Sequence, residues 1–222
     1  MHKPANYHCS NCYSNNRNIT NYFNSYNGRY YSADPKSLPN SSVKTDYSDS
    51  YDNDSGECIP RKGELVRNGG FENPHNSFHN WVTNYGVDVT EPGLGDTPHQ
   101  GFTAARLGYL EPHALIYQDI PGICPGGFYQ LSFFMSTDNN QCNPPIIVRL
   151  EFLDKHKHPL ENPALDILIP PYSLFEAYSS YINATRWPSP KQAHFLRLIF
   201  ETDTIADADG YVKLDDVSLI AL

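Results

Sequence analysis

The five cysteines are the residues of this chain with the clearest capacity for covalent chemistry. They are Cys9, Cys12, Cys58, Cys124 and Cys142. An odd count leaves at least one thiol that is free or bonded to another molecule. The CxxC spacing of the first two suits a redox motif only within a βαβ unit, which the surrounding sequence does not predict. Zinc would need a second ligand pair, and the nearby candidates are His2 and His8. We therefore interpret this CxxC pair as disulfide-forming, with a partner in Cys58 or in another chain.

Two disulfide arrangements are open for the remaining cysteines. In an assembly, Cys58, Cys124 or Cys142 of the next subunit would accept a bond from the CxxC pair. Alternatively, Cys124 and Cys142 flank one expected strand and could pair within a single domain. All five are therefore candidates for bonds between subunits.

The sequence contains side chains that could take part in catalysis, but their spacing matches no catalytic motif. Carboxylate pairs such as Glu151 and Glu201 are expected by chance among 25 acidic residues. No pair has a spacing that points to glycosidic cleavage, and no serine has the context of a nucleophile elbow. The histidines follow no trusted metal-ligand spacing. We expect no enzymatic activity.

Aromatic side chains offer a second kind of chemistry, because carbohydrate-binding modules present them at loop tips or on a concave face. Trp187, in the sequence Arg-Trp-Pro-Ser-Pro, is predicted to lie in a loop and is the ligand-binding candidate. Trp81 follows a strand pattern and is expected in the core.

Short alternating segments indicate an all-β domain. Leu65 and Phe71 anchor an expected first strand that breaks at Asn68-Gly69-Gly70, where the glycines suit positive φ or close backbone approach. Further strands are predicted at 78–81, 85–90, within 99–108, and at 114–120, 128–136, 146–153, 164–169, 175–182, 194–200 and 210–220. No segment reads as a helix. The pattern predicts an antiparallel jelly-roll sandwich.

The composition divides the chain at residue 62. Residues 1–62 contain eight of the sixteen tyrosines, ten asparagines and ten serines, with seven basic and six acidic residues. Residues 63–222 contain nine basic and nineteen acidic residues, which makes this domain a poor candidate for nucleic-acid binding. The first residues lack the apolar stretch of a signal peptide, and no window is long enough to span a membrane. We expect an extended tail followed by one domain.

An ordered set of motifs resembles a known group of jelly rolls. The motifs are Asn68-Gly-Gly-Phe-Glu72, Trp81, the segment 99–108, Gln118-Asp-Ile-Pro121, the segment 125–134 and Leu214-Asp-Asp-Val-Ser-Leu219. They resemble the galactose-binding-like jelly rolls, which include several carbohydrate-binding modules. Within that group the chain resembles the NTTRR domain of spore-surface proteins, with Asn183-Ala-Thr-Arg-Trp187 as a loose version of the naming motif. The collagen-like triplets that usually accompany that domain are absent, and the long tail stands in their place.

The resemblance implies a structural calcium ion. Its ligands would be Glu72 and Asp215 or Asp216, with backbone carbonyls around residues 68–70. Calcium prefers six to eight hard oxygens and accepts carbonyls, so these residue types are suitable.

The sequence and the resemblance together predict a self-assembling structural subunit of a bacterial spore surface, in the exosporium, the coat or an appendage. The tail would dock by strand addition, for example through residues 26–31, and would be linked by disulfides to copies of the same chain. Other spore-coat or exosporium proteins are further expected partners. A carbohydrate-binding module or an adhesive tip protein on the spore surface is the alternative, with glycans as ligands.

Overall fold

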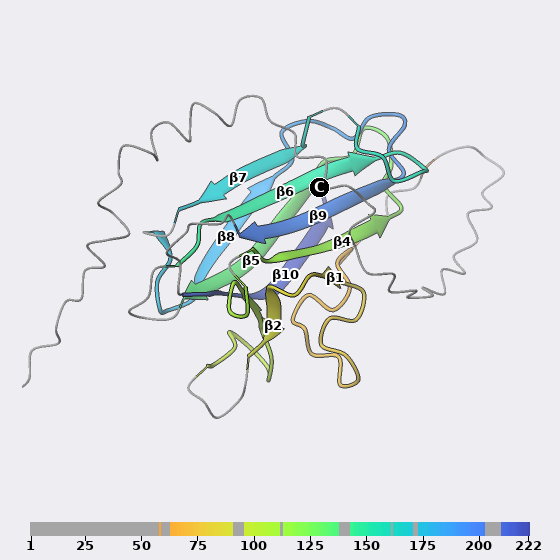
Figure 1. Cartoon of the computed structure of the whole chain (residues 1–222). Helices are drawn as coiled ribbons and strands as arrows, with labels where there is room; N and C mark the ends of the chain where they lie inside the picture. Colours follow the sequence, from red (N-terminus) through yellow and green to blue (C-terminus); the bar gives the residue numbers. More distant parts are fainter. Residues whose placement is uncertain are drawn as a thin grey trace, which may run out of the picture.

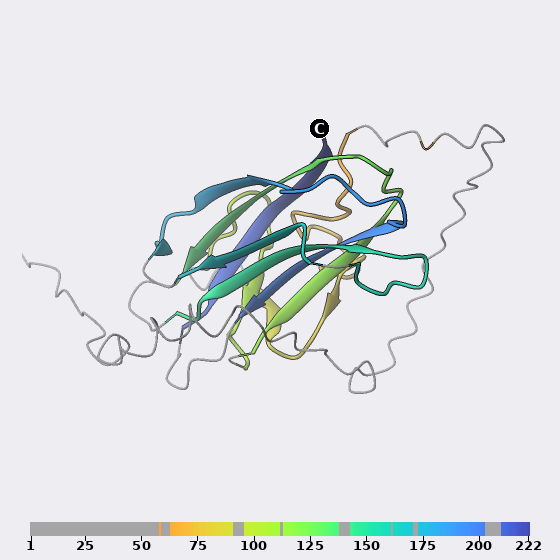
Figure 2. The same cartoon turned by 90° about the horizontal axis from the view of Figure 1, so that it is seen from above.

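The computed structural model describes residue 58 and residues 63–90, 96–111, 113–137, 143–160, 162–170, 173–202 and 210–222. These residues form two five-stranded antiparallel sheets that pack face to face (Figures 1 and 2). The all-β sandwich expected from the sequence is confirmed. No helix in the part described is long and apolar enough to cross a membrane.

The sheet nearer the viewer in Figure 1, here called the front sheet, has the strand order β1-β4-β9-β6-β7. Its strands are β1 (Val82–Thr83), β4 (Leu115–Pro121), β9 (Phe195–Thr202), β6 (Ile146–Leu153) and β7 (Leu165–Ile169). The back sheet has the order β2-β3-β10-β5-β8. Its strands are β2 (Val87–Val89), β3 (Ala105–Leu107), β10 (Val212–Ala221), β5 (Tyr129–Thr137) and β8 (Ser179–Ala184).

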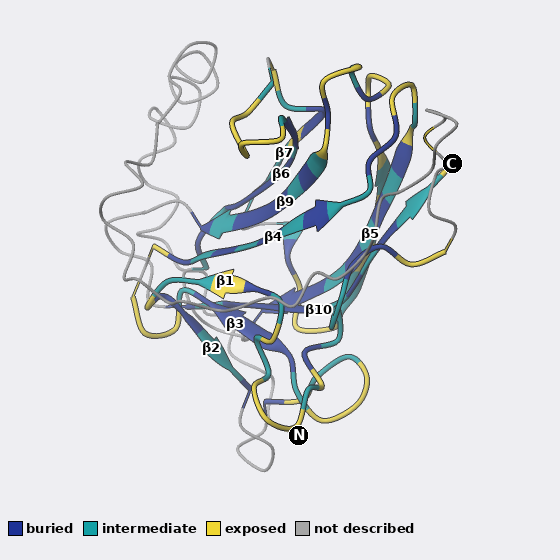
Figure 3. Cartoon of the chain, turned by 90° about the vertical axis from the view of Figure 1, so that its right-hand side faces the viewer, coloured by how far each residue is buried: buried dark blue, intermediate teal, exposed yellow. Residues whose placement is uncertain are grey.

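The core lies between the two sheets and is made by every second residue of the central strands. In β4, for example, Ile116, Gln118 and Ile120 are buried, while the residues between them are partly exposed. Phe133 of the back sheet meets Phe200 of the front sheet edge to face, with ring centroids 5.1 Å apart. Figure 3 shows the exposed residues gathered mainly in the loops at the strand ends. Each strand therefore has one face fixed by the core and one face free for other roles.

The predicted strands overlap those of the structure from β4 onward, and β6 has the predicted bounds, but the strand expected at 175–182 lies at Ser179–Ala184. The start of the domain differs. The segment around Leu65 makes one isolated bridge, between Glu64 and Ile220, and is not a regular strand. Residues 78–81 form a turn that precedes β1. Leu65, Phe71 and Trp81 are nevertheless buried as expected, because side-chain burial there does not require a continuous ladder.

Gly69 is required by close backbone approach. A Cβ at this position would lie 1.9 Å from the carbonyl oxygen of Val217, and Val217 N donates to Gly69 O at 3.0 Å. The left-handed φ angles fall on the neighbours Asn68 (55°) and Phe71 (59°). Of the two reasons the sequence offered for this glycine pair, close approach is the correct one for Gly69.

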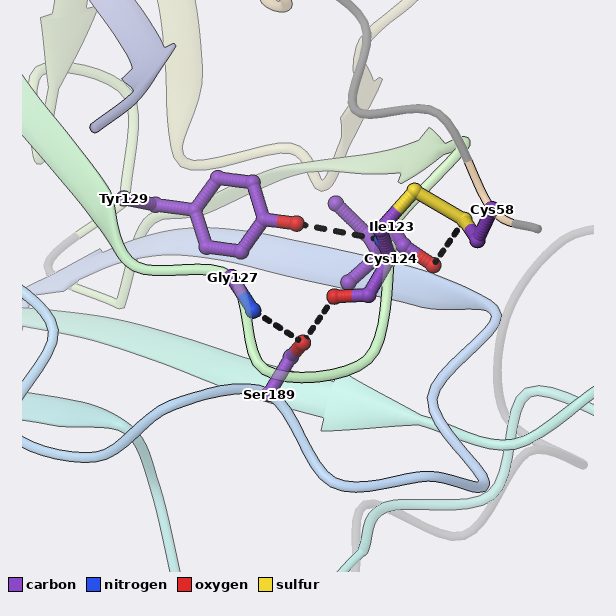
Figure 4. The surroundings of a disulfide bond; sticks show 6 residues. All are labelled: Cys58, Ile123, Cys124, Gly127, Tyr129 and Ser189. Atoms are coloured by element: carbon purple, nitrogen blue, oxygen red, sulfur yellow. Dashed lines mark hydrogen bonds between the residues drawn. A yellow bond between two sulfur atoms is a disulfide. The ribbon is translucent and has the colours of Figure 1, made fainter.

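One disulfide joins Cys58 to Cys124, with Cα atoms 5.4 Å apart (Figure 4). Tyr129 Oη accepts from the amide of Cys124 at 3.2 Å, and Ser189 Oγ donates to the Cys124 carbonyl. This bond corrects three expectations: Cys58 is not the partner of the CxxC pair, neither bonded cysteine is left as an acceptor for another subunit, and Cys124 is not paired with Cys142. Cys9, Cys12 and Cys142 lie outside the described residues. The bond also joins residue 58, assigned to the tail, covalently to the sandwich.

Candidate functional site

The outer face of the front sheet carries a grid of charged and aromatic side chains. Strand pairing places Asp119 of β4, Arg197 of β9 and Glu151 of β6 in one row across three strands. The next row contains Tyr117, Ile199, Arg149 and Asp166, on β4, β9, β6 and β7. These side chains lie on the outer face because the residues that alternate with them along the same strands point into the core. This grid is the charged face.

Arg197, in the middle of the first row, is bonded to Asp119 at one end. Its Nε and Nη2 donate to the two carboxylate oxygens of Asp119 at 2.7 and 3.1 Å, and its Cζ lies 4.7 Å from the ring centroid of Tyr117. Lys157 Nζ lies 3.0 Å from the same carboxylate. Burial acts to raise the pKa of Asp119, but the bonds and charges of Arg197 and Lys157 outweigh it and lower that pKa. Asp119 therefore stays ionised and fixes the guanidinium in place.

Glu151 at the other end of the row has no such partner. Within the described part of the chain, no donor lies at hydrogen-bonding or ion-pair distance from its carboxylate. Burial raises the pKa of Glu151, and the nearby charges of Arg149 and Arg197 offset this only in part. The Glu151 oxygens are not among the fully buried side-chain atoms, so this half-buried carboxylate is accessible and is a candidate for ligand contact.

The second guanidinium of the charged face is held by a neighbouring carboxylate. Arg149 Nη2 donates to Glu201 Oε2, and His113 Nε2 lies 3.0 Å from Glu201 Oε1. The Nε atom of Arg149 is buried and has no hydrogen-bond partner. The sequence had singled out Glu151 and Glu201 only as a chance pair. The structure puts both on this face, where they flank the two arginines.

The three residues proposed as calcium ligands come together at a different place, where the last strand of the back sheet meets the loop at residues 99–103. Glu72 Oε1 accepts from the amides of Phe102 and Thr103 at 2.7 and 2.8 Å. Asp215 Oδ2 accepts from the amides of His99 and Gln100 at 2.8 and 3.2 Å.

Asp216 completes this acidic cluster through a histidine that the sequence did not predict. Its Oδ2 lies 2.6 Å from His99 Nδ1, and the His99 ring stacks on Phe134 with centroids 3.7 Å apart. The register of β10 shifts between Asp215 and Ser218, and Asp216 has a φ of 47°. This irregularity lets two successive acidic residues both serve the loop. It could not be read from alternation, which would put them on opposite faces.

The donor types of this cluster suit a hard cation, but their arrangement does not yet form a metal site. Among the described residues, no three ligating side chains come close enough to hold a metal ion. Backbone N–H groups already use oxygens of Glu72 and Asp215. Burial raises the pKa of Asp215 to about 6 despite the amide bonds from Gln100, Asp216 and His99. The cluster as described pins a loop by hydrogen bonds, and calcium there stays a prediction.

Trp187 lies in the loop between β8 and β9 and is 61% exposed. Its exposed position agrees with the loop expected for it. Trp81, in contrast, packs 5.5 Å from the Phe71 ring and donates from Nε1 to Asn68 O at 3.0 Å. The two tryptophans therefore have separate roles, one structural and one available to solvent.

No protein-family model matches this chain, and no curated protein matches it. Solved structures do match in fold. The enzymatically active domain of tailspike protein 4 from bacteriophage CBA120 is 20% identical over 72% of this chain and 21% of its own, with a TM-score of 0.53. A cyclase from Fischerella sp. TAU is 16% identical over 73% of this chain and 98% of its own, with a TM-score of 0.53.

A tandem of CBM22 carbohydrate-binding modules from Paenibacillus barcinonensis Xyn10C is also similar. It is 15% identical over 75% of this chain and 48% of its own, with a TM-score of 0.51. Identities this low establish the fold alone, and this chain spans about a fifth of the tailspike domain. The chain thus has a carbohydrate-binding-like β-sandwich fold, which also occurs in proteins described as enzymes. The finer resemblance to the spore-surface domain stays a prediction.

Replacing Glu151 by glutamine is expected to stabilise the protein at neutral pH. Because the folded-state pKa of Glu151 is raised above its usual 4.5, the fold favours the protonated form. The stability this group contributes is present below the unfolded-state pKa and lost as pH rises through the folded-state pKa. The free energy of unfolding, measured in urea, should therefore be higher for E151Q than for wild type at pH 7. The two values should become equal near pH 4. A lower stability of E151Q at pH 7 would show that the arginines hold the carboxylate as an ion pair.

Calcium binding at the acidic cluster is tested by thermal unfolding with 1 mM Ca²⁺ against EDTA. A bound ion should raise the midpoint, since a ligand at 100 times its Kd adds about 2.7 kcal/mol of stability. Asp216→Asn should abolish the rise while keeping the left-handed backbone, which asparagine tolerates. Mg²⁺ is the control, because it rarely occupies all-protein cages. Equal midpoints in Ca²⁺ and EDTA would mean that hydrogen bonds alone hold the loop.

Proposed function

We propose that this protein binds neutral glycan chains on the charged face of the front sheet. The observation that carries the proposal is the half-buried carboxylate of Glu151, which lies beside two guanidinium groups and has no hydrogen-bond donor among the described residues. The carbohydrate-binding-like fold supports it, since similar sandwiches include CBM22 modules.

The chemistry of the charged face favours sugar hydroxyls. A carboxylate accepts hydrogen bonds from hydroxyl groups, and such charge-assisted bonds are stronger than neutral ones. Arg197 and Arg149 are held in fixed positions by Asp119 and Glu201, so the row is preorganised and little side-chain freedom is lost on binding. Tyr117 lies in the adjacent row, with its ring 4.7 Å from the Arg197 guanidinium carbon. An anionic sugar would meet the Glu151 charge, so neutral glycans are the better ligands.

A glycan array of neutral and anionic oligosaccharides tests this proposal. Wild type should bind neutral chains, and E151Q should bind them about tenfold more weakly, because a charge-assisted hydrogen bond contributes about 1.5–3 kcal/mol. Ser132→Ala, on the outer face of the back sheet, is the matched control and should bind normally. Trp187→Ala separates the two candidate sites. Loss of binding in W187A together with normal binding in E151Q would move the site to the loop and reject the charged face.

A second candidate function is the self-assembling subunit of a spore surface. The cysteine count favours it, because the Cys58–Cys124 bond leaves Cys9, Cys12 and Cys142. Three thiols cannot all pair within one chain. A structural disulfide also suits a protein that ends in an oxidising environment, such as the surface of a spore. In this proposal the partners are copies of the same chain and other exosporium or coat proteins.

Non-reducing electrophoresis of the oxidised full chain tests the cross-linking. Wild type should form a ladder of covalent multimers that collapses with reductant, because an unpaired thiol on one copy can bond to another. Cys9→Ser with Cys12→Ser should remove the ladder, and Cys142→Ser serves as the comparison for a cysteine of the domain. A ladder that persists in the double variant would exclude the tail cysteines as the linking residues.

A further inference from the structure

Three of the four edge strands in the sandwich are protected against pairing with another strand. β1 and β2 have two and three residues, which is too short to serve as a template. β7 carries the exposed Asp166, and Arg186 Nη2 donates to the Asp166 carbonyl at 3.5 Å. Natural sheets use short strands and charged residues in this way to prevent edge-to-edge association.

The fourth edge, β8, has none of these protections. Its six residues are Ser-Ser-Tyr-Ile-Asn-Ala, with no charge and no proline, and among the described strands it pairs only with β5. Ser180, Ile182 and Ala184 are exposed, and the Ile182 side chain is 63% exposed. Six residues give an edge of about 20 Å, which is enough for a further strand.

The register shows which backbone groups of β8 point to the free edge. Thr185 N donates to Tyr129 O at 2.9 Å, which makes this a hydrogen-bonded pair of the antiparallel ladder with β5. Such pairs alternate along the strand, so residues 183, 181 and 179 also bond to β5. The N–H and C=O groups of Ser180, Ile182 and Ala184 therefore face outward.

We propose that residues 18–26 of the same chain pair with β8 as a sixth strand of the back sheet. This segment reads Asn-Ile-Thr-Asn-Tyr-Phe-Asn-Ser-Tyr. It contains no charge, proline or glycine, and it is rich in the residue types that favour strands. It lies among residues 1–57, which are outside the described part of the chain.

The disulfide favours docking within one chain. Cys124 lies in the loop that leads into β5, and the amides of Gly126 and Gly127 in that loop donate to Ser189, just past β8. Cys58 is therefore fixed at the end of the β5–β8 pair (Figure 4). The 31 residues between the segment and Cys58 could extend about 100 Å, several times the length of β8. A tether of this kind gives an effective concentration of about millimolar, which a second copy reaches only at high protein concentration.

Amide hydrogen exchange on the full chain tests the docking. The amides of Ser180, Ile182 and Ala184 should exchange at least about tenfold more slowly in wild type than in a chain whose residues 18–26 are replaced by nine glycine and serine residues. The amides of residues 179, 181 and 183 bond to β5 and should stay protected in both, which shows that the sandwich remains folded. Equal exchange of the outward amides in the two chains would overturn the proposal.

A second variant blocks the edge and leaves the tail intact. Ile182→Pro removes an outward N–H while sparing the ladder to β5, so the amides of Ser180 and Ala184 should lose protection. Ile182→Ala keeps the N–H of residue 182, so the amides of Ser180 and Ala184 should remain protected in this variant. Unchanged protection in I182P would overturn the proposal. Protection that rises with protein concentration, together with larger species in gel filtration, would assign the strand to a second copy and also overturn docking within one chain. The test is independent of glycan binding, which is proposed for the other sheet.

Discussion

The two-residue alternation of the central strands is the constraint on which both faces of this molecule depend. Residues such as Ile116, Leu198 and Phe200 must point inward to fill the space between the sheets. Because successive side chains of a strand point to opposite faces, their neighbours along the same strands point outward. Asp119, Arg197 and Glu151 are thus aligned across the sheet by core packing, without any direct selection of their spacing along the chain. A one-residue slip in register would bury these charges and expose the core.

The same alternation explains how much the sequence predicts. The strands from β4 to β10 could be read from the sequence because apolar and polar residues alternate within them, and turn residues separate them. The order of strands in each sheet could not be read, since Asp119, Arg197 and Glu151 are far apart in the chain and share a row only through pairing. Local irregularities of the backbone could not be predicted from the sequence either. Neither the register shift after Asp215 nor the contact of Gly69 with Val217 has a periodic signal.

The two halves of the proposed biology use opposite sheets and opposite chemistry. The front sheet offers fixed charges and the accessible carboxylate of Glu151, which suits reversible contact with polar ligands. The back sheet ends in an uncharged edge whose outward backbone groups have no partner among the described residues, and the tail is proposed to pair with them. The acidic cluster of Glu72, Asp215 and Asp216 belongs to neither, and it joins the start of the domain to its last strand and to the loop at residues 99–103. Sites on separate surfaces can evolve without disturbing one another.

The bond between Cys58 and Cys124 also changes what a protease can do to this protein. It closes a covalent ring that contains β1, β2, β3 and β4. A single cut anywhere inside the ring opens it without releasing a fragment, because the sulfur bridge still joins the two pieces. Each piece keeps its partners in the sheets, so the nicked sandwich can retain its packing. In an oxidising environment the protein would tolerate a cut between residues 58 and 124 that would split a chain without the bridge.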